Sequence, residues 1–272
     1  MNEHPDVAAR FWALHAGARP LLLPNPWDVG SAKLLASLGF QALATTSSGY
    51  AATLGRLDGR VTREEAIEHA ASIVAATELP VSADLENAFA ADAGGVADTV
   101  ALAAEAGLAG CSVEDYGGRA DDRIYDRGVA AERVAAAAET AHSGPVRIVL
   151  TARAENYVHR QPDLVDTIER LQAYQEAGAD VLFAPGLTDL VDIRTLVAAV
   201  DRPVNVLAGP RAPAVAELGA AGVRRVSVGG AFAFAALGAV VEAAHELTEA
   251  GTYTFWERAA AGARAARAAF AE

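Results

Sequence analysis

Short apolar segments alternate with helical patterns along almost the whole chain, and this alternation limits the fold more than any other feature. Eight segments rich in Val, Leu and Ile have the length of buried strands, and each is followed by a helical pattern. Several helical patterns run into a glycine, as at Gly107, Gly178 and Gly222, where a helix commonly ends. The expected strands are 21–24, 42–47, 81–86, 110–114, 147–153, 181–184, 204–207 and 225–228.

Eight strands and eight helices in 272 residues favour an α/β fold of the (β/α)8 TIM-barrel type. An open doubly wound sheet is the alternative, but its first turn is usually glycine-rich, and here residues 24–28 read Pro-Asn-Pro-Trp-Asp. No linker divides the chain, so we expect one domain over 1–272, with the barrel over about 18–250. A final helical segment, about 251–272, should pack on the barrel or on a neighbouring subunit.

Composition excludes several classes of function. The net charge of -13 without a basic stripe argues against nucleic acid and anionic membranes as partners. We find no apolar run of about 20 residues and no signal-like N-terminus, so a soluble cytoplasmic protein is expected. Cys111 is the only cysteine, which excludes a disulfide within the chain, and Lys33 is the only lysine. Since Lys33 lies within a helical pattern, a Schiff-base mechanism is not expected.

Polar side chains gather where the expected strands end. Because the active sites of such barrels lie at the carboxyl ends of the strands, these residues should meet at one mouth. Crowded carboxylates repel one another unless a cation lies among them, and oxygen ligands without histidine favour Mg²⁺ or Mn²⁺ over zinc. Of the six histidines, only His159 is expected near this mouth. The residues expected there are Asp58, Asp84, Glu86, Ser112, Glu114, Thr151, Arg153 and Glu155.

These residues also have structural interpretations. Arg153 could hold a substrate carboxylate or phosphonate in a bidentate manner, or it could pair with Glu114 or Glu155. The backbone amides of residues 47–49 could bind a carboxylate, or the segment could be a tight exit from a strand. An aspartate at a strand end often caps the next helix, and glutamates in loops are often simply solvated.

Six short motifs, in order, resemble the isocitrate lyase / phosphoenolpyruvate mutase superfamily over residues from about 10 to 250. This resemblance implies a (β/α)8 barrel that exchanges a C-terminal helix between subunits and forms a homodimer or homotetramer. It also implies Mg²⁺ and a small 2-oxo or 2-hydroxy carboxylate, cleaved or formed through an enolate-like intermediate. The motifs are Asn25-Pro26-Trp27-Asp28 with Ser31-Ala32, Ser48-Gly49-Tyr50, Asp58, Ala83-Asp84-Leu85-Glu86, Val113-Glu114-Asp115 and Ala152-Arg153-Ala154-Glu155.

The resemblance also implies a role for each site residue. Asp84 resembles the carboxylate that contacts the metal directly, while Glu86 and Glu114 resemble those that reach it through water. Asp58 resembles an aspartate beside the reacting centre, and Arg153 resembles the arginine that grips the substrate. The backbone amides of Ser48, Gly49 and Tyr50 are implied to bind the substrate carboxylate. Asp58, Glu114 and Arg153 are therefore the candidate catalytic residues.

One loop departs from the family. Isocitrate and methylisocitrate lyases carry a Lys-x-Cys-Gly-His loop, whereas residues 116–122 here read Tyr-Gly-Gly-Arg-Ala-Asp-Asp. In those lyases the loop is implied to supply the acid that protonates a leaving enolate, and this chain lacks it. A Mg²⁺-dependent carbon–carbon lyase resembling oxaloacetate decarboxylase is therefore the favoured prediction, with Mn²⁺ as a possible substitute. A phosphonopyruvate hydrolase or phosphoenolpyruvate mutase is the first alternative, and a non-catalytic 2-oxo-acid-binding protein is the second. The proton donor is left open among Tyr50, Tyr116, Arg119 and His159.

Overall fold

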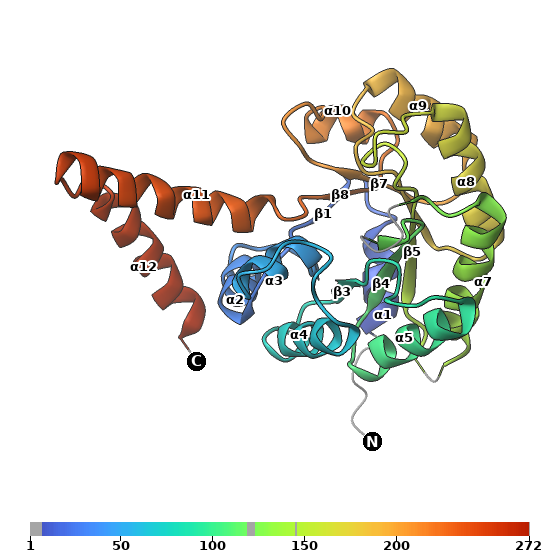
Figure 1. Ribbon diagram of the computed structural model, residues 1–272, viewed down its shortest axis with the longest axis horizontal. Coiled ribbons are helices and arrows are strands. Elements are labelled where there is room, and N and C mark those ends of the chain that lie inside the picture. Colours follow the sequence, from blue (N-terminus) through green and yellow to red (C-terminus); the bar gives the residue numbers. More distant parts are fainter. Residues whose placement is uncertain (1–6, 119–122, 145, 272) are drawn as a thin grey trace.

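The strands form one parallel eight-stranded sheet that curls into a barrel (Figure 1). The computed structural model describes residues 7–118, 123–144 and 146–271. Neighbouring strands pair in the order β1-β8-β7-β6-β5-β4-β3-β2, and the Ala44 amide donates to the Pro24 carbonyl (3.0 Å) across the seam between β1 and β2. The predicted (β/α)8 barrel is therefore confirmed. The strands are β1 Leu21–Leu23, β2 Leu43–Ala44, β3 Val81–Asp84, β4 Gly110–Glu114, β5 Val149–Arg153, β6 Val181–Phe183, β7 Val204–Leu207 and β8 Arg225–Ser227.

Helices surround the barrel, and most follow the expected pattern (Figure 1). Two were not expected: α1 precedes the first strand, and α3 begins at Ser47, where a strand was predicted to end. The helices are α1 Val7–Leu14, α2 Val29–Ser37, α3 Ser47–Thr53, α4 Arg63–Ala75, α5 Ala93–Glu105, α7 Arg127–Ser143, α8 Leu164–Glu176, α9 Leu190–Ala199, α10 Val215–Ala220, α11 Ala231–His245, η1 Glu246–Ala250 and α12 Trp256–Phe270.

Local side chains determine where several helices begin and end. Asp28 accepts the Ser31 amide at the start of α2, and Thr46 accepts the Gly49 amide at the start of α3, as N-cap residues do. After α5, α8 and α10 the backbone adopts positive φ at Gly107 (+81°), Gly178 (+106°) and Gly222 (+91°). The prediction that these three helices end at a glycine is therefore confirmed. Glycine suits this conformation because it has no Cβ to strain.

The amino end of the barrel is closed by α1. Phe11 is fully buried against the first residues of the strands, among them Leu21, Val149 and Val181. A Cβ at Gly110 would lie 3.0 Å from the Phe11 ring, so this strand needs a glycine to admit the helix. With the amino end filled, any binding site inside the barrel must open at the carboxyl ends of the strands.

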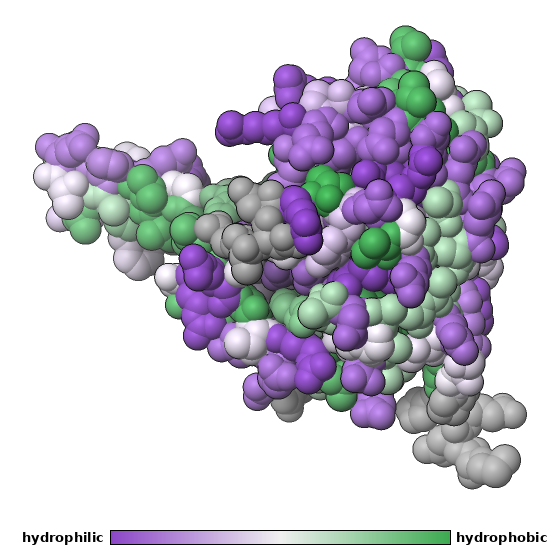
Figure 2. Space-filling model, turned by 45° about the vertical axis from the view of Figure 1, so that its right-hand side comes forward, coloured by the Kyte–Doolittle hydropathy of each residue, from purple (hydrophilic) through white to green (hydrophobic). Residues whose placement is uncertain are grey.

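The last helices form an arm, residues 231–270, that projects from the barrel (Figure 1). From the tip of α11, helix α12 runs back towards α2 (Figure 1), and the Phe270 ring lies 3.6 Å from the position of a Cβ at Gly30 of α2. Hydrophobic residues lie along the arm (Figure 2), among them Phe234, Leu237 and Val240, each about half exposed or more. The predicted exchange of a C-terminal helix between subunits is not shown by this single chain and stays a prediction.

One expectation about hydrophobic segments is corrected. Residues Ala231–Ala250 form a continuous 20-residue helix that is long and apolar enough to cross a membrane. The sequence contains no uninterrupted apolar run of that length, because Glu242 and His245 divide this one, but its alanines and aliphatic residues make the whole helix apolar. One such helix is weak evidence of a membrane span, and this one lies on the exposed arm and not in the core.

Candidate active site

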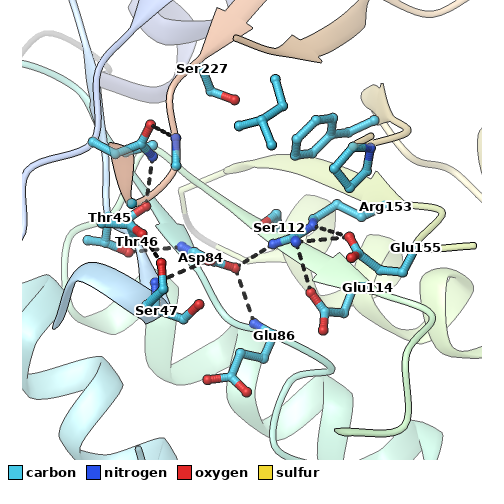
Figure 3. Close-up of a pocket in the computed structure, with 18 of the residues that line it drawn as sticks. Thr45, Thr46, Ser47, Asp84, Glu86, Ser112, Glu114, Arg153, Glu155 and Ser227 are labelled. Atoms are coloured by element: carbon cyan, nitrogen blue, oxygen red, sulfur yellow. Dashed lines mark hydrogen bonds and ion pairs between the residues drawn. The ribbon is translucent and has the colours of Figure 1, made fainter. Parts of the chain in front are cut away.

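A cavity of about 500 Å³ opens at the carboxyl ends of the strands and extends into the barrel. Its upper part is crowded with charged side chains from β3, β4 and β5 (Figure 3). The structure thus brings together most of the residues that the sequence placed at this mouth. Those lining the cavity are Ser48, Asp58, Asp84, Glu86, Ser112, Glu114, Arg153, Glu155 and His159, whereas Thr151 lies deeper.

Arg153 is at the centre of this charged group (Figure 3). Its Nη1 lies 2.7 Å from Oδ1 of Asp84, and its Nη2 lies 3.1 Å from Oε2 of Glu114 and 2.9 Å from Oε1 of Glu155. All four side chains are at most 17% exposed. Arg153 therefore pairs with both glutamates that the sequence analysis named as possible partners, and also with Asp84 on β3.

Burial and the neighbouring opposite charges shift the pKa values of these groups in opposite directions. Burial raises the pKa of Glu114 well above its usual range and also raises that of Glu155, while the Arg153 charge opposes both shifts. For Arg153, burial alone would lower the pKa, but the charges of Glu155, Glu114 and Asp84 raise it further above its usual value. Arg153 thus stays positively charged among three acidic side chains.

Backbone contacts hold Asp84 in place. Its amide donates to Oγ1 of Thr45 (2.9 Å), and its Oδ2 accepts the amide of Ser47 at the start of α3 (3.2 Å). Glu86 lines the cavity, but not from within a strand, as the expected strand 81–86 implied. The strand ends at Asp84, and Glu86 then adopts a φ of +49°, a conformation that is costly for a residue with a Cβ.

Asp58 lines the same cavity from the loop between α3 and α4. Its pKa is raised by partial burial and by the charge of Asp84, against the hydrogen bond from Ser47. An aspartate that holds its proton more readily than usual is suited to exchanging protons with a substrate. Its position agrees with the expected role beside the reacting centre, which stays a prediction.

The segment predicted to bind a carboxylate is only partly at the cavity. Ser48 lines it, but Gly49 is buried and Tyr50 stacks on His69, with ring centroids 3.9 Å apart. The amide of Gly49 donates to Thr46 Oγ1, and that of Tyr50 donates to the Thr46 carbonyl, because the segment is the first turn of a helix. Substrate binding by these three residues stays a prediction.

Two aromatic rings close one side of the mouth. Tyr116 and His159 both line the cavity and stack with centroids 3.6 Å apart. Phe183 lies on another side, with its ring centroid 5.4 Å from Cζ of Arg153. Residues 119–122, which include the candidate Arg119, lie outside the described residues.

Sequence reasoning missed the support beneath Glu155. Oδ1 of Asp115 accepts the Glu155 amide (2.8 Å), while its Oδ2 accepts from the Tyr174 hydroxyl (2.6 Å) and from Arg170 (3.2 Å). Asp115 is itself buried. The buried Asp115 carboxylate thus fixes the backbone from which Glu155 reaches Arg153. Only the polar character of Asp115 next to a strand end could have indicated this role.

The donor set fits a hard divalent cation held largely through water. Within residues 7–118, 123–144 and 146–271, no group of three His, Cys, Asp or Glu side chains is arranged to hold a metal directly. The available donors are carboxylate oxygens, and Arg153 lies among them. Mg²⁺ suits such a site, because it keeps several waters and needs only one or two protein carboxylates. The metal roles of Asp84, Glu86 and Glu114 stay predictions.

Comparison with known proteins assigns the family. A family model described as phosphoenolpyruvate phosphomutase matches residues 11–248. The chain belongs to the isocitrate lyase / phosphoenolpyruvate mutase superfamily. A solved structure of a candidate lyase/mutase from Burkholderia cenocepacia is 53% identical, covers 92% of this chain and 90% of its own, and superimposes with a TM-score of 0.89.

Relatives within this superfamily include lyases. Oxaloacetate decarboxylase from Chromohalobacter salexigens is 31% identical over 89% of this chain and 85% of its own length. The 2-methylisocitrate lyase of Escherichia coli is 32% identical over 71% of this chain and 67% of its own length. The predicted superfamily membership is therefore confirmed, and an enzymatic function agrees with it.

Proposed function

We propose that the protein is a Mg²⁺-dependent lyase that cleaves a carbon–carbon bond in a small 2-oxo acid, with decarboxylation of oxaloacetate as the favoured reaction. The observation that carries this proposal is the pairing of Arg153 with Asp84 inside the cavity. This arrangement places a guanidinium that can bind a carboxylate beside the oxygen donors that suit a divalent cation.

Each side chain has a separate role. Asp84 would hold Mg²⁺ directly, and Glu86 and Glu114 would hold it through water. When bound there, Mg²⁺ supplies Lewis-acid stabilisation for the negative charge that develops on the substrate. Arg153 orients the substrate carboxylate and keeps its own charge because of its acidic neighbours. Asp58, whose pKa is raised, exchanges a proton at the mouth.

Decarboxylation suits this chain because carbon dioxide leaves without being protonated. The absence of the Lys-x-Cys-Gly-His loop then removes no group that bond cleavage requires. The relationship to oxaloacetate decarboxylase supports the same choice. Cleavage of a phosphorus–carbon bond is the second candidate, and the match of the phosphoenolpyruvate phosphomutase model over residues 11–248 favours it.

Turnover distinguishes these candidates. The purified protein is incubated with oxaloacetate or phosphonopyruvate, with and without Mg²⁺, and pyruvate, inorganic phosphate and phosphoenolpyruvate are measured. Pyruvate formed from oxaloacetate above the spontaneous rate, and only with Mg²⁺, supports the proposal. Phosphate released from phosphonopyruvate, or phosphoenolpyruvate formed from it, favours the second candidate. Ligand binding without any turnover contradicts both and favours a non-catalytic 2-oxo-acid-binding protein.

We further propose that the protein is soluble and cytoplasmic and forms a homodimer or homotetramer through its arm. The exposed side chains of Phe234, Leu237 and Val240 form an apolar surface that a second copy would cover. Val240→Asp should therefore lower the mass measured by analytical ultracentrifugation to that of a monomer. Val191→Asp on α9, also exposed, is the control and should leave the mass unchanged. A monomeric wild-type protein would contradict this proposal.

A further inference from the structure

The loop after β5 places an imidazole at the mouth of the cavity. His159 lines the cavity and its side chain is 28% exposed, so both a bound molecule and the solvent reach the ring. The His159 amide donates to the Glu155 carbonyl (3.0 Å), which closes one turn and puts the two side chains on the same side. Asn156 anchors this turn, since its Nδ2 donates to Oγ1 of Thr167 on α8 (2.7 Å). The imidazole therefore stands on a fixed support.

Two neighbours favour the protonated form of the His159 ring. Its Nε2 lies 4.0 Å from Oε2 of Glu155, and the ring stacks on Tyr116 with the centroids 3.6 Å apart and 17° between the planes. A carboxylate and the face of a phenol ring both attract an imidazolium. Tyr116 is itself held by its pairing with Ile124. Because an imidazole gains and loses a proton near neutral pH, this ring is equipped to act as an acid.

Glu155 links the imidazole to the proposed substrate position (Figure 3). Its Oε1 lies 2.9 Å from Nη2 of Arg153 and its Oε2 faces His159, so one carboxylate separates the ring from the guanidinium that is proposed to bind the substrate. Asp84 contacts the other terminal nitrogen, Nη1, of the same guanidinium. The imidazole and the proposed metal-binding carboxylate thus approach Arg153 from different sides. A proton can cross the remaining gap directly or through one water.

The other candidate proton donors are less well placed. Tyr50 stacks on His69 and is absent from the described residues that line the cavity. Arg119 lies outside the described residues, and a guanidinium holds its proton too firmly to act as an acid. Asp58 enters from the loop between α3 and α4, and its pKa is raised by partial burial and by the charge of Asp84, so it serves the substrate near the proposed metal position.

We propose that protonated His159 is the catalytic acid that completes the reaction, by donating a proton to the carbon from which carbon dioxide has left. This inference rests on the proposed function. Breaking the carbon–carbon bond of oxaloacetate leaves its electron pair in the enolate of pyruvate. A ring nitrogen of His159 supplies the proton for the new carbon–hydrogen bond at C3, and the neutral ring then takes a proton from the solvent at the mouth.

Two rates measured in parallel test this role. Carbon dioxide and the keto form of pyruvate are followed from oxaloacetate with Mg²⁺, after subtraction of the spontaneous reaction. Wild-type protein should form both at the same rate. His159→Gln should still release carbon dioxide but let enolpyruvate escape, so the keto form, detected with lactate dehydrogenase, should lag behind. In deuterium oxide this variant should exchange the methyl protons of pyruvate, the reverse of the proposed step, about 100-fold more slowly, as for loss of a general acid.

Further variants separate proton transfer from a structural role. His159→Ala should lose the exchange and recover part of it when imidazole is added. Tyr116→Phe keeps the stacked ring, removes its hydroxyl and should exchange protons as wild type does. His245→Gln, exposed on the arm, is the matched control and should change neither rate. His159→Gln should bind oxalate with Mg²⁺ as tightly as wild type in calorimetric titration, since only the proton donor is removed.

Contrary results are distinguishable. If the keto form keeps pace with carbon dioxide in His159→Gln and the exchange is unchanged, or if Tyr116→Phe or Asp58→Asn loses the exchange while His159→Gln retains it, His159 is not the acid and the proposed function stands. Loss of oxalate binding in His159→Gln, without recovery of the exchange by imidazole in His159→Ala, gives the residue a structural role and also overturns the inference. If wild-type protein releases no carbon dioxide from oxaloacetate with Mg²⁺, both the inference and the proposed function are wrong.

Discussion

Nη1 of Arg153 lies 2.7 Å from Oδ1 of Asp84, although the two residues are 69 positions apart and belong to different strands. This contact joins the residue expected to bind the substrate with the residue expected to bind the metal. Because Glu114 and Glu155 pair with the same guanidinium, a change at Arg153 affects both the charge balance and the stability of the site.

Arg153→Met should abolish ligand binding and also destabilise the fold. It leaves two buried glutamates without their cation, and removing one partner from a buried ion pair costs about 3–5 kcal/mol. Urea unfolding at neutral pH measures this loss, with the exposed Arg194→Met on α9 as the control. Unchanged stability would show that the glutamates do not depend on Arg153. Arg153→Lys should restore stability better than binding, because an ammonium cannot form the bidentate contact.

His15 should make the stability depend on pH. Its pKa in the folded protein is lowered from 6.5 to about 4, chiefly by burial, so between these values the unfolded chain binds a proton and the folded one does not. Stability is therefore expected to fall by about 3 kcal/mol as the pH decreases from 6.5 through 4. Urea unfolding between pH 7.5 and 4.5 should show a shallower loss in His15→Gln. The exposed His245→Gln should retain the wild-type slope, and identical slopes in both variants would disprove this assignment.

Gly49 should not tolerate a side chain. A Cβ there would lie 2.5 Å from Cγ2 of Thr46 and 3.2 Å from Cβ of Trp27, so Gly49→Ala must displace the first turn of α3. We expect a loss of about 1–3 kcal/mol, as for other overpacked sites. Gly262→Ala is the matched control, because nothing lies within 4 Å of its Cβ position on α12, and it should stabilise by about 0.5–1 kcal/mol. Equal effects in guanidinium unfolding would contradict this account.

The barrel could be predicted from the sequence because strand alternation and glycine stops are local signals. The expected strands 110–114 and 204–207 coincide with β4 and β7. Helix α3 was missed because its first turn, Ser47-Ser48-Gly49, consists of poor helix formers, and the Thr46 cap is visible only in three dimensions.

The contacts of the site were less predictable because they join distant strands. The sequence placed Asp84 and Arg153 at one mouth, but their direct pairing depends on how the barrel closes. Arg225, which also lines the cavity, was not singled out at all, because Arg224-Arg225 next to a short strand resembles an exposed basic pair. Strand alternation sends only the second of the two into the interior.

Calorimetric titration of oxalate into the protein, with and without Mg²⁺, tests the metal-centred site most directly. Wild-type protein should bind oxalate only with Mg²⁺. Asp84→Ala should lose that binding and slow any turnover about 100- to 1,000-fold, as loss of a charge stabiliser does elsewhere. Asp92→Ala, which removes only the N-cap of α5, should bind as wild type. Equal binding by Asp84→Ala, or no binding by wild-type protein in either condition, would contradict the proposed site.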